Sequence, residues 1–96
     1  MEIKDEELIH EFNKVLKKCS ELQKKKNSDY NAGGLVSYND YFKFLPNIYE
    51  HMVWAKSLRL MAVIKSKNIK NESIEDTLMD IINYAGLALA RRKLNE

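Results

Sequence analysis

The stretch PNIYEHMVWAKSLRLMAVIK, residues 46–65, decides the fold. Pro46 suits the first turn of a helix, because its ring fixes φ and its missing N–H is not needed there. We therefore expect a helix from Pro46 to about Lys65. Apolar side chains cover nearly its whole circumference: Ile48, Tyr49, Met52, Val53, Trp54, Ala55, Leu58, Leu60, Met61, Ala62, Val63 and Ile64. A helix without a polar face is central, or lies between a core and a partner chain.

Amphipathic helices are expected on both sides of this central one. From Asp5 to Lys26, apolar residues recur at alternating steps of four and three, at Leu8, Phe12, Val15, Cys19 and Leu22. The run Lys24–Lys26 would then lie at the end of the helix, where the dipole favours cations, or form a rim that attracts phosphate. A last helix starts near Asn71 and ends near Lys93. Its expected core face comprises Ile74, Leu78, Ile81, Ile82, Ala85, Ala88 and Leu89.

The segments between these helices carry turn residues. NSDYNAGGLVS, residues 27–37, contains paired glycines and is expected to be a loop. Residues 38–45 are too few to decide between a short helix and a loop. The sequence thus predicts one all-α domain over residues 1–96, a small bundle of three long helices and at most one short one.

Length and charge restrict the partners. A 96-residue chain gives limited cover for an all-apolar helix, so a homo-oligomer, a dimer or larger, is expected. A net charge of +2 does not favour duplex DNA or an anionic membrane, and no window approaches the roughly 20 apolar residues of a membrane span. The single cysteine, Cys19, fits a reducing compartment. We expect a cytoplasmic protein, in the host cytoplasm if the chain is viral.

The last helix carries three acids at four-residue steps. Glu72, Asp76 and Asp80 share one surface with Asn83, roughly opposite the expected core face. Three carboxylates in three turns can hold Mg²⁺, which binds through a few carboxylates, water and phosphate oxygens. The same residues also fit a plain solvated face, so both interpretations stay open.

Two further groups suit an anion. Lys56 and Arg59 project from one face of an otherwise apolar helix, where they can grip a phosphate or simply extend their charges past the core. In the expected loop, Asp29 can accept a hydrogen bond from a ribose or base and Tyr30 can stack on a base. Neither of the usual glycine-rich phosphate loops is present. Nucleophilic catalysis is poorly supported, because the chain offers only two histidines, no strained serine motif and a cysteine on the core stripe.

These pieces together resemble a known family. KKNSDYNAGG, WAKSLRLMAVIKSK and NESIEDTLMDIINYAGLAL, in this order, are similar to the nucleotide modification associated domain of the first type, found in phages and bacteria. The resemblance covers residues 24–90. The matching positions are Lys26, Asn27, Asp29, Tyr30, Lys56, Arg59, Asn71, Glu72, Ser73, Asp76, Asp80 and Tyr84. That family in turn looks like a relative of the MazG-type all-α nucleotide pyrophosphatases, which hold Mg²⁺ with helix carboxylates.

The resemblance implies a nucleotide ligand and leaves three functions open. The first is a module that binds a nucleotide or nucleotide-derived phosphate, cyclic or linear, through Lys26, Asp29, Tyr30, Lys56, Arg59 and Tyr84; in a phage it would sequester a host defence signal. The second is a Mg²⁺-dependent nucleoside triphosphate pyrophosphohydrolase with Glu72, Asp76 and Asp80 as metal ligands. This sequence departs from those enzymes, because its central helix offers only Glu50 and its last helix spaces acids by four. The third is a structural or protein-interaction module.

Overall fold

The computed structural model describes residues 2–32, 47–66 and 71–95, without the side chains of residues 27, 29–32 and 71–73. It contains three helices, α1 (Asp5–Ala32), α3 (Ile48–Lys65) and α4 (Asn71–Leu94). No strand occurs in the described ranges, so the predicted all-α bundle of three long helices is confirmed. The open question of a short helix over 38–45 lies outside the described residues, as does Pro46 itself. The predicted start of the following helix at Pro46 is wrong, because α3 begins at Ile48 and Asn47 before it has a left-handed backbone.

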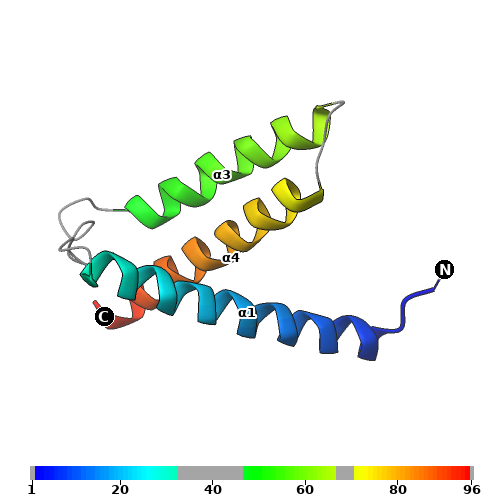
Figure 1. The fold of residues 1–96 in the computed structure, drawn as a ribbon, viewed down its shortest axis with the longest axis horizontal. Helices are drawn as coiled ribbons and strands as arrows, with labels where there is room; N and C mark the ends of the chain where they lie inside the picture. The colour runs from blue at the N-terminus through cyan, green and yellow to red at the C-terminus, as the bar shows by residue number, and fades with distance from the viewer. Residues whose placement is uncertain (1, 33–46, 67–70, 96) are drawn as a thin grey trace.

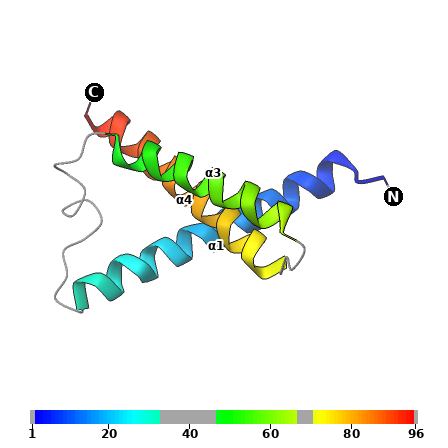
Figure 2. The ribbon, with the colours of Figure 1, turned by 90° about the horizontal axis from the view of Figure 1, so that it is seen from above.

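The helices form an α3–α4 hairpin crossed by α1. α3 packs along α4, whereas α1 touches α4 over a shorter stretch. The N-terminal part of α1, drawn in blue, extends beyond the hairpin in both views (Figures 1 and 2). An exposed ion pair joins the start of α3 to the end of α4, with Arg92 Nη2 donating to Glu50 Oε2 at 2.8 Å. No described helix has the length and hydrophobicity needed to cross a lipid bilayer.

α1 is longer than the sequence predicts. It continues through residues 27–32, which we expected to begin a loop, and ends at Ala32, directly before the paired glycines. Lys24–Lys26 therefore lie inside the helix, and its last turn contains no basic residue. The dipole interpretation of this basic run is wrong. Asn, Ser and Asp disfavour a helix by only a few tenths of a kcal/mol each, up to roughly 0.7, so the four such residues in 27–32 prolong a formed helix at small cost.

The start of α3 shows why a helix begins at Ile48. Asn47 precedes it with φ 59° and ψ 23°, in the left-handed region that Asn tolerates better than most residues. Its side chain makes no capping hydrogen bond, but its carbonyl accepts from the His51 N–H at 3.0 Å. Asn47 thus accepts the first hydrogen bond of α3, while its left-handed backbone changes the direction of the chain before the helix.

α4 is rotated relative to the prediction. Thr77, which lies outside the expected core face, is only 3% exposed, whereas Leu78, Ala85 and Leu89 of that face are exposed. Ala88, another member of the expected face, is buried as predicted, at 7% exposure. The apolar residues of α4 cover more than half of its circumference, so the pattern alone does not say which part faces α3. With this rotation Asp80, expected on a solvated face, turns towards α1 and α3.

Tyr49, near the start of α3, is buried in the α3–α4 contact. Its side chain is 3% exposed, and it is the largest of the three apolar residues that are buried in the described chain, beside Cys19 and Ala88. The Tyr49 ring lies 6.4 Å from the Tyr84 ring, at a tilt of 30°, within the range of favourable aromatic pairs. The Arg91 guanidinium lies over the same ring, 5.9 Å from its centroid.

Burial raises the pKa of the Tyr49 hydroxyl above its ordinary value, and Arg91 partly offsets this. The neutral hydroxyl is thus favoured in the folded state, so its contribution to stability is complete below about pH 10, the ordinary pKa of tyrosine, and is lost as the pH rises through the folded pKa. We expect the melting temperature above about pH 10 to fall more steeply in the wild type than in Tyr49→Phe. Parallel slopes for the two proteins would contradict this.

Candidate functional site

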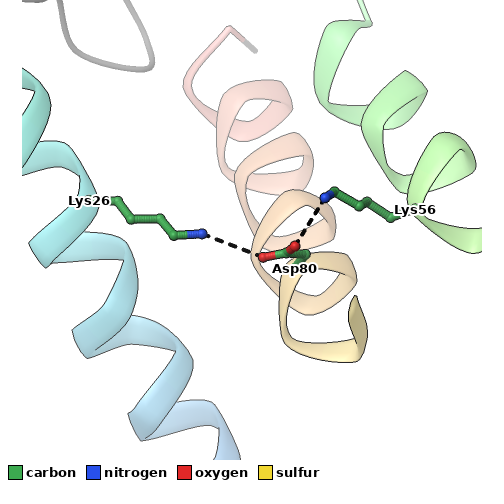
Figure 3. Close-up of polar contacts among 3 residues, drawn as sticks. All are labelled: Lys26, Lys56 and Asp80. Atoms are coloured by element: carbon green, nitrogen blue, oxygen red, sulfur yellow. Dashed lines mark hydrogen bonds and ion pairs between the residues drawn. The ribbon is translucent and has the colours of Figure 1, made fainter. Parts of the chain in front are cut away.

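Three charged side chains from three helices meet at Asp80. Lys26 of α1 and Lys56 of α3 approach the carboxylate of Asp80 on α4 from opposite sides (Figure 3). Lys26 Nζ lies 3.5 Å from Oδ1, and Lys56 Nζ lies 3.1 Å from Oδ2. Each carboxylate oxygen therefore contacts one ammonium group. Two cations share one anion, which leaves an excess positive charge at the junction of the helices.

The three side chains are partly buried. Side-chain exposure is 38% for Lys26, 27% for Lys56 and 23% for Asp80. Ion pairs at this depth are screened less by water and salt than surface pairs. Both lysine side chains still reach solvent, so a dissolved anion can approach them without unfolding the bundle.

Local sequence explains how the lysines arrive at this junction. Lys26 continues the four-and-three stripe of α1, one step of four after Leu22, and so lies on the face that packs against α4. Lys56 lies one turn before Leu60 and two turns after Tyr49, on the side of α3 that faces α4. Their aliphatic stems pass along the apolar contact while the charges gather at its rim.

Lys56 and Arg59, which the sequence paired, have different surroundings in the structure: Lys56 is half-buried and contacts Asp80. Arg59 is exposed, and within the described residues no ion pair involves it. Lys56 instead joins Lys26, which the sequence marked only through its basic run and the family resemblance. The spacing from Leu22 to Lys26 was the signal that could have placed Lys26 on the packing face. Tyr84 lies in the α3–α4 contact beside Tyr49.

Some predicted site residues cannot be placed by their side chains. Asp29 and Tyr30 fall in the last turns of α1 rather than in a loop, and Glu72 falls in the first turn of α4. The side chains of all three lie outside the described part of the chain. Their predicted roles at the ligand or the metal remain predictions.

The residues of the predicted metal site fit Mg²⁺ only in part. Asp76, one turn before Asp80, is exposed and available. Asp80 has an ammonium group on each oxygen, so a cation there has to displace a lysine. Among the described side chains, no group of three or more His, Cys, Asp or Glu could hold a metal ion. The side chain of Glu72 is not among those described.

A groove runs between α1 and α4 beside this junction. Its volume is about 280 Å³, and it is lined by Leu16, Cys19, Ser20, Gln23, Lys24, Ile82, Asn83, Gly86 and Leu87. Asn83 Nδ2 is buried and has no hydrogen-bond partner in the described part of the chain. Burial raises the pKa of the Cys19 thiol; Lys18 lowers it and Asp80 raises it further, so this cysteine is unsuited to act as a nucleophile.

The chain stands apart in comparisons with known proteins: no protein-family model, no curated protein and no solved structure matches it.

Proposed function

We propose that the chain is a small helical module that binds a nucleotide or a nucleotide-derived phosphate, cyclic or linear. The observation that carries this proposal is the convergence of Lys26 and Lys56 on Asp80. A phosphate has more charge and more acceptor oxygens than one carboxylate, and charge-assisted hydrogen bonds to it are strong. It can therefore compete with Asp80 for both lysines.

Neighbouring groups support a nucleotide rather than free phosphate. Arg59 lies one turn after Lys56 and is exposed, and an arginine fork suits a second phosphate. Asp29 and Tyr30 follow Lys26 by one turn on α1 and supply the chemistry for sugar or base contacts. The resemblance to a nucleotide modification associated domain favours the same ligand class. In a phage setting the module would sequester a host defence signal within the host cytoplasm.

A Mg²⁺-dependent nucleoside triphosphate pyrophosphohydrolase is the alternative. It is favoured by the exposed Asp76 one turn from Asp80, because these two carboxylates lie on one helix surface next to the proposed phosphate site. In that function Asp80→Asn abolishes turnover. Binding that persists in EDTA without pyrophosphate release favours the first function instead.

Thermal shift with a nucleotide panel tests the proposal. The panel comprises adenosine and guanosine mono-, di- and triphosphates, a cyclic mononucleotide and a cyclic dinucleotide, each with Mg²⁺ and with EDTA. A ligand present at a hundred times its dissociation constant should stabilise the fold by about 2.7 kcal/mol. Lys26→Gln and Lys56→Gln should each weaken that ligand by about tenfold or more, because a charged hydrogen bond contributes about 1.5–3 kcal/mol.

Lys14→Gln is the matched control. Lys14 lies on α1 as Lys26 does and also pairs with an acid, Glu11, at 3.2 Å, but both side chains are well exposed. Its loss should leave nucleotide affinity unchanged. If no member of the panel raises the melting temperature, or if Lys14→Gln weakens binding as much as Lys56→Gln does, phosphate recognition at Asp80 is excluded. A protein-interaction module is then the better account.

A further inference from the structure

The described residues expose far more apolar side chain than they bury. Their exposed large apolar residues are Ile3, Leu8, Ile9, Phe12, Val15, Leu16, Trp54, Leu58, Met61, Ile64, Leu78, Leu89 and Leu94. The chain has an accessible surface of 7902 Å², whereas a compact protein of 11.3 kDa exposes about 5,700 Å². Its radius of gyration is 15.5 Å, against about 12.5 Å expected for 96 residues. An isolated chain is therefore incompletely covered.

Part of this apolar surface forms one continuous face around the α1–α4 groove. Leu16 of α1 and Ile82 and Gly86 of α4 line the groove. Ile9 and Phe12 precede Leu16 by two turns and one turn, and Leu78, Ala85 and Leu89 lie within one turn of Ile82 or Gly86. We call Ile9, Phe12, Leu16, Leu78, Ala85, Gly86 and Leu89 the α1–α4 face.

The geometry points to a second copy of this chain as the occupant of the α1–α4 face. Summed over the whole chain, polar and apolar atoms together, the excess surface is roughly 2,200 Å². Each partner in an obligate homodimer buries about 1,000–2,500 Å², so the excess is large enough to supply such an interface. The N-terminal part of α1 extends beyond its own hairpin, so it is free to pack on another one (Figure 2). Nothing lies within 4 Å of a Cβ built on Gly86, so a second helix can approach α4 closely there.

Charges beside the face distinguish a second copy from a foreign protein. Glu6, Lys17 and Lys24 are exposed and fall on one stripe of α1 that flanks Phe12 and Leu16. The acid lies at the N-terminal end of the stripe and the bases towards the C-terminal end. A two-fold axis perpendicular to α1 reverses the direction of α1 in the second copy, so where the two α1 helices lie side by side the acid of each copy faces the bases of the other. The face is complementary to itself in charge as well as in hydrophobicity.

Light scattering after size exclusion at micromolar concentration tests this. The wild type should have twice the 11.3 kDa mass of one chain. Phe12→Lys and Leu89→Lys should each raise the dimer dissociation constant about a hundredfold or more, because an ammonium group buried against apolar side chains without a partner is strongly unfavourable. Both residues are more than half exposed in the single chain, so each change should remove few contacts within it.

Leu58→Lys is the matched control, because Leu58 is 53% exposed, as Phe12 is 55% exposed, but lies on α3. It should remain a dimer.

Gly86→Leu gives an independent test, because the expected change in melting temperature has opposite signs for an isolated chain and for the proposed dimer. In an isolated chain it raises the melting temperature, since leucine favours a helix and the space is open, whereas in the proposed dimer it lowers both the mass and the melting temperature.

Three outcomes would overturn the proposal. If the wild type has the mass of one chain at micromolar concentration, a second copy does not cover the α1–α4 face, and a different protein would have to bind there. A dimer that Leu58→Lys breaks and that both α1–α4 variants leave intact would place the contact on α3. A Gly86→Leu protein that melts higher with its dimer mass unchanged would show that no second helix packs at that position.

Discussion

Asp80→Asn should lower stability and strengthen phosphate binding at the same time. The substitution removes the negative charge that Lys26 and Lys56 share, leaving two partly buried ammonium groups facing each other. Exposed ion pairs contribute about 0.2–1 kcal/mol each, while breaking a fully buried one costs about 3–5 kcal/mol. Asp80 and the two lysines are buried to an intermediate degree, so we expect a loss of about 2 kcal/mol in the free energy of unfolding. Urea denaturation measures this loss.

The opposite sign for binding follows from the same contacts. In the wild type a phosphate has to displace the Asp80 carboxylate from both lysines, and the neutral amide introduced by Asp80→Asn competes far less. We expect inorganic phosphate and the best nucleotide of the panel to bind about tenfold more tightly, an effect of about 1.4 kcal/mol. A structural role for the ion pairs alone would lower stability and leave phosphate affinity unchanged. A metal-ligand role would instead weaken the Mg²⁺–nucleotide complex.

Asp76→Asn is the matched control for this prediction. Asp76 is one turn before Asp80 on the same helix but is exposed, so its loss should change stability by less than about 0.5 kcal/mol. Double-mutant cycles should show stronger coupling of Asp80 with Lys56, at 3.1 Å, than with Lys26, at 3.5 Å. If Asp80→Asn also lost less than about 0.5 kcal/mol, as expected for Asp76→Asn, the two lysine contacts would contribute nothing measurable to stability.

The three helices were predictable, because each has either a regular apolar period or a long apolar run. The last helix runs from Asn71 to Leu94, as its pattern indicated, and α3 ends at Lys65. The expectation that α3 is the central helix is wrong, because α4 lies between α3 and α1 (Figure 1). The end of α1 was not predictable, since the weak helix formers in residues 27–32 only slightly disfavour a helix that is already formed. Propensity marks where a helix can end, whereas the actual end also depends on contacts across the chain.

The site was predictable in its residue types and not in its pairings. Lys26, Lys56 and Asp80 were all candidates, but the sequence placed Asp80 among acids on a solvated surface and paired Lys56 with Arg59. Residues sharing a helix face can be read from spacing, because the helix period is fixed. Contacts between Lys26 and Asp80, 54 residues apart, depend on how α1 crosses α4 and how α4 is rotated. An apolar stripe on α4 as broad as this one fits several rotations, so spacing alone cannot choose among them.

Tyr49→Ala should cause a larger loss of stability than any of the charge substitutions at Asp80, Lys26 or Lys56. Tyr49 is the largest side chain among the buried apolar residues described, and truncating a buried aromatic ring to alanine costs about 3–5 kcal/mol. A domain of this size has a total stability of about 5–15 kcal/mol, so the variant should lose a large fraction of it. The measurement is urea denaturation followed by helical circular dichroism.

Trp54→Ala is the control that tests whether the loss of stability comes from burial of the ring or only from its aromatic character. Trp54 is on the same helix and also contacts a ring, with its centroid 5.6 Å from that of His51, but its side chain is 60% exposed. Its truncation should cost less than about 1 kcal/mol, because little apolar area returns to water. If Trp54→Ala destabilised the protein as much as Tyr49→Ala did, the outer side of α3 would be buried in solution. The α3–α4 contact around Tyr49 would then not be the main source of stability, and a second copy would have to cover α3 rather than the α1–α4 face.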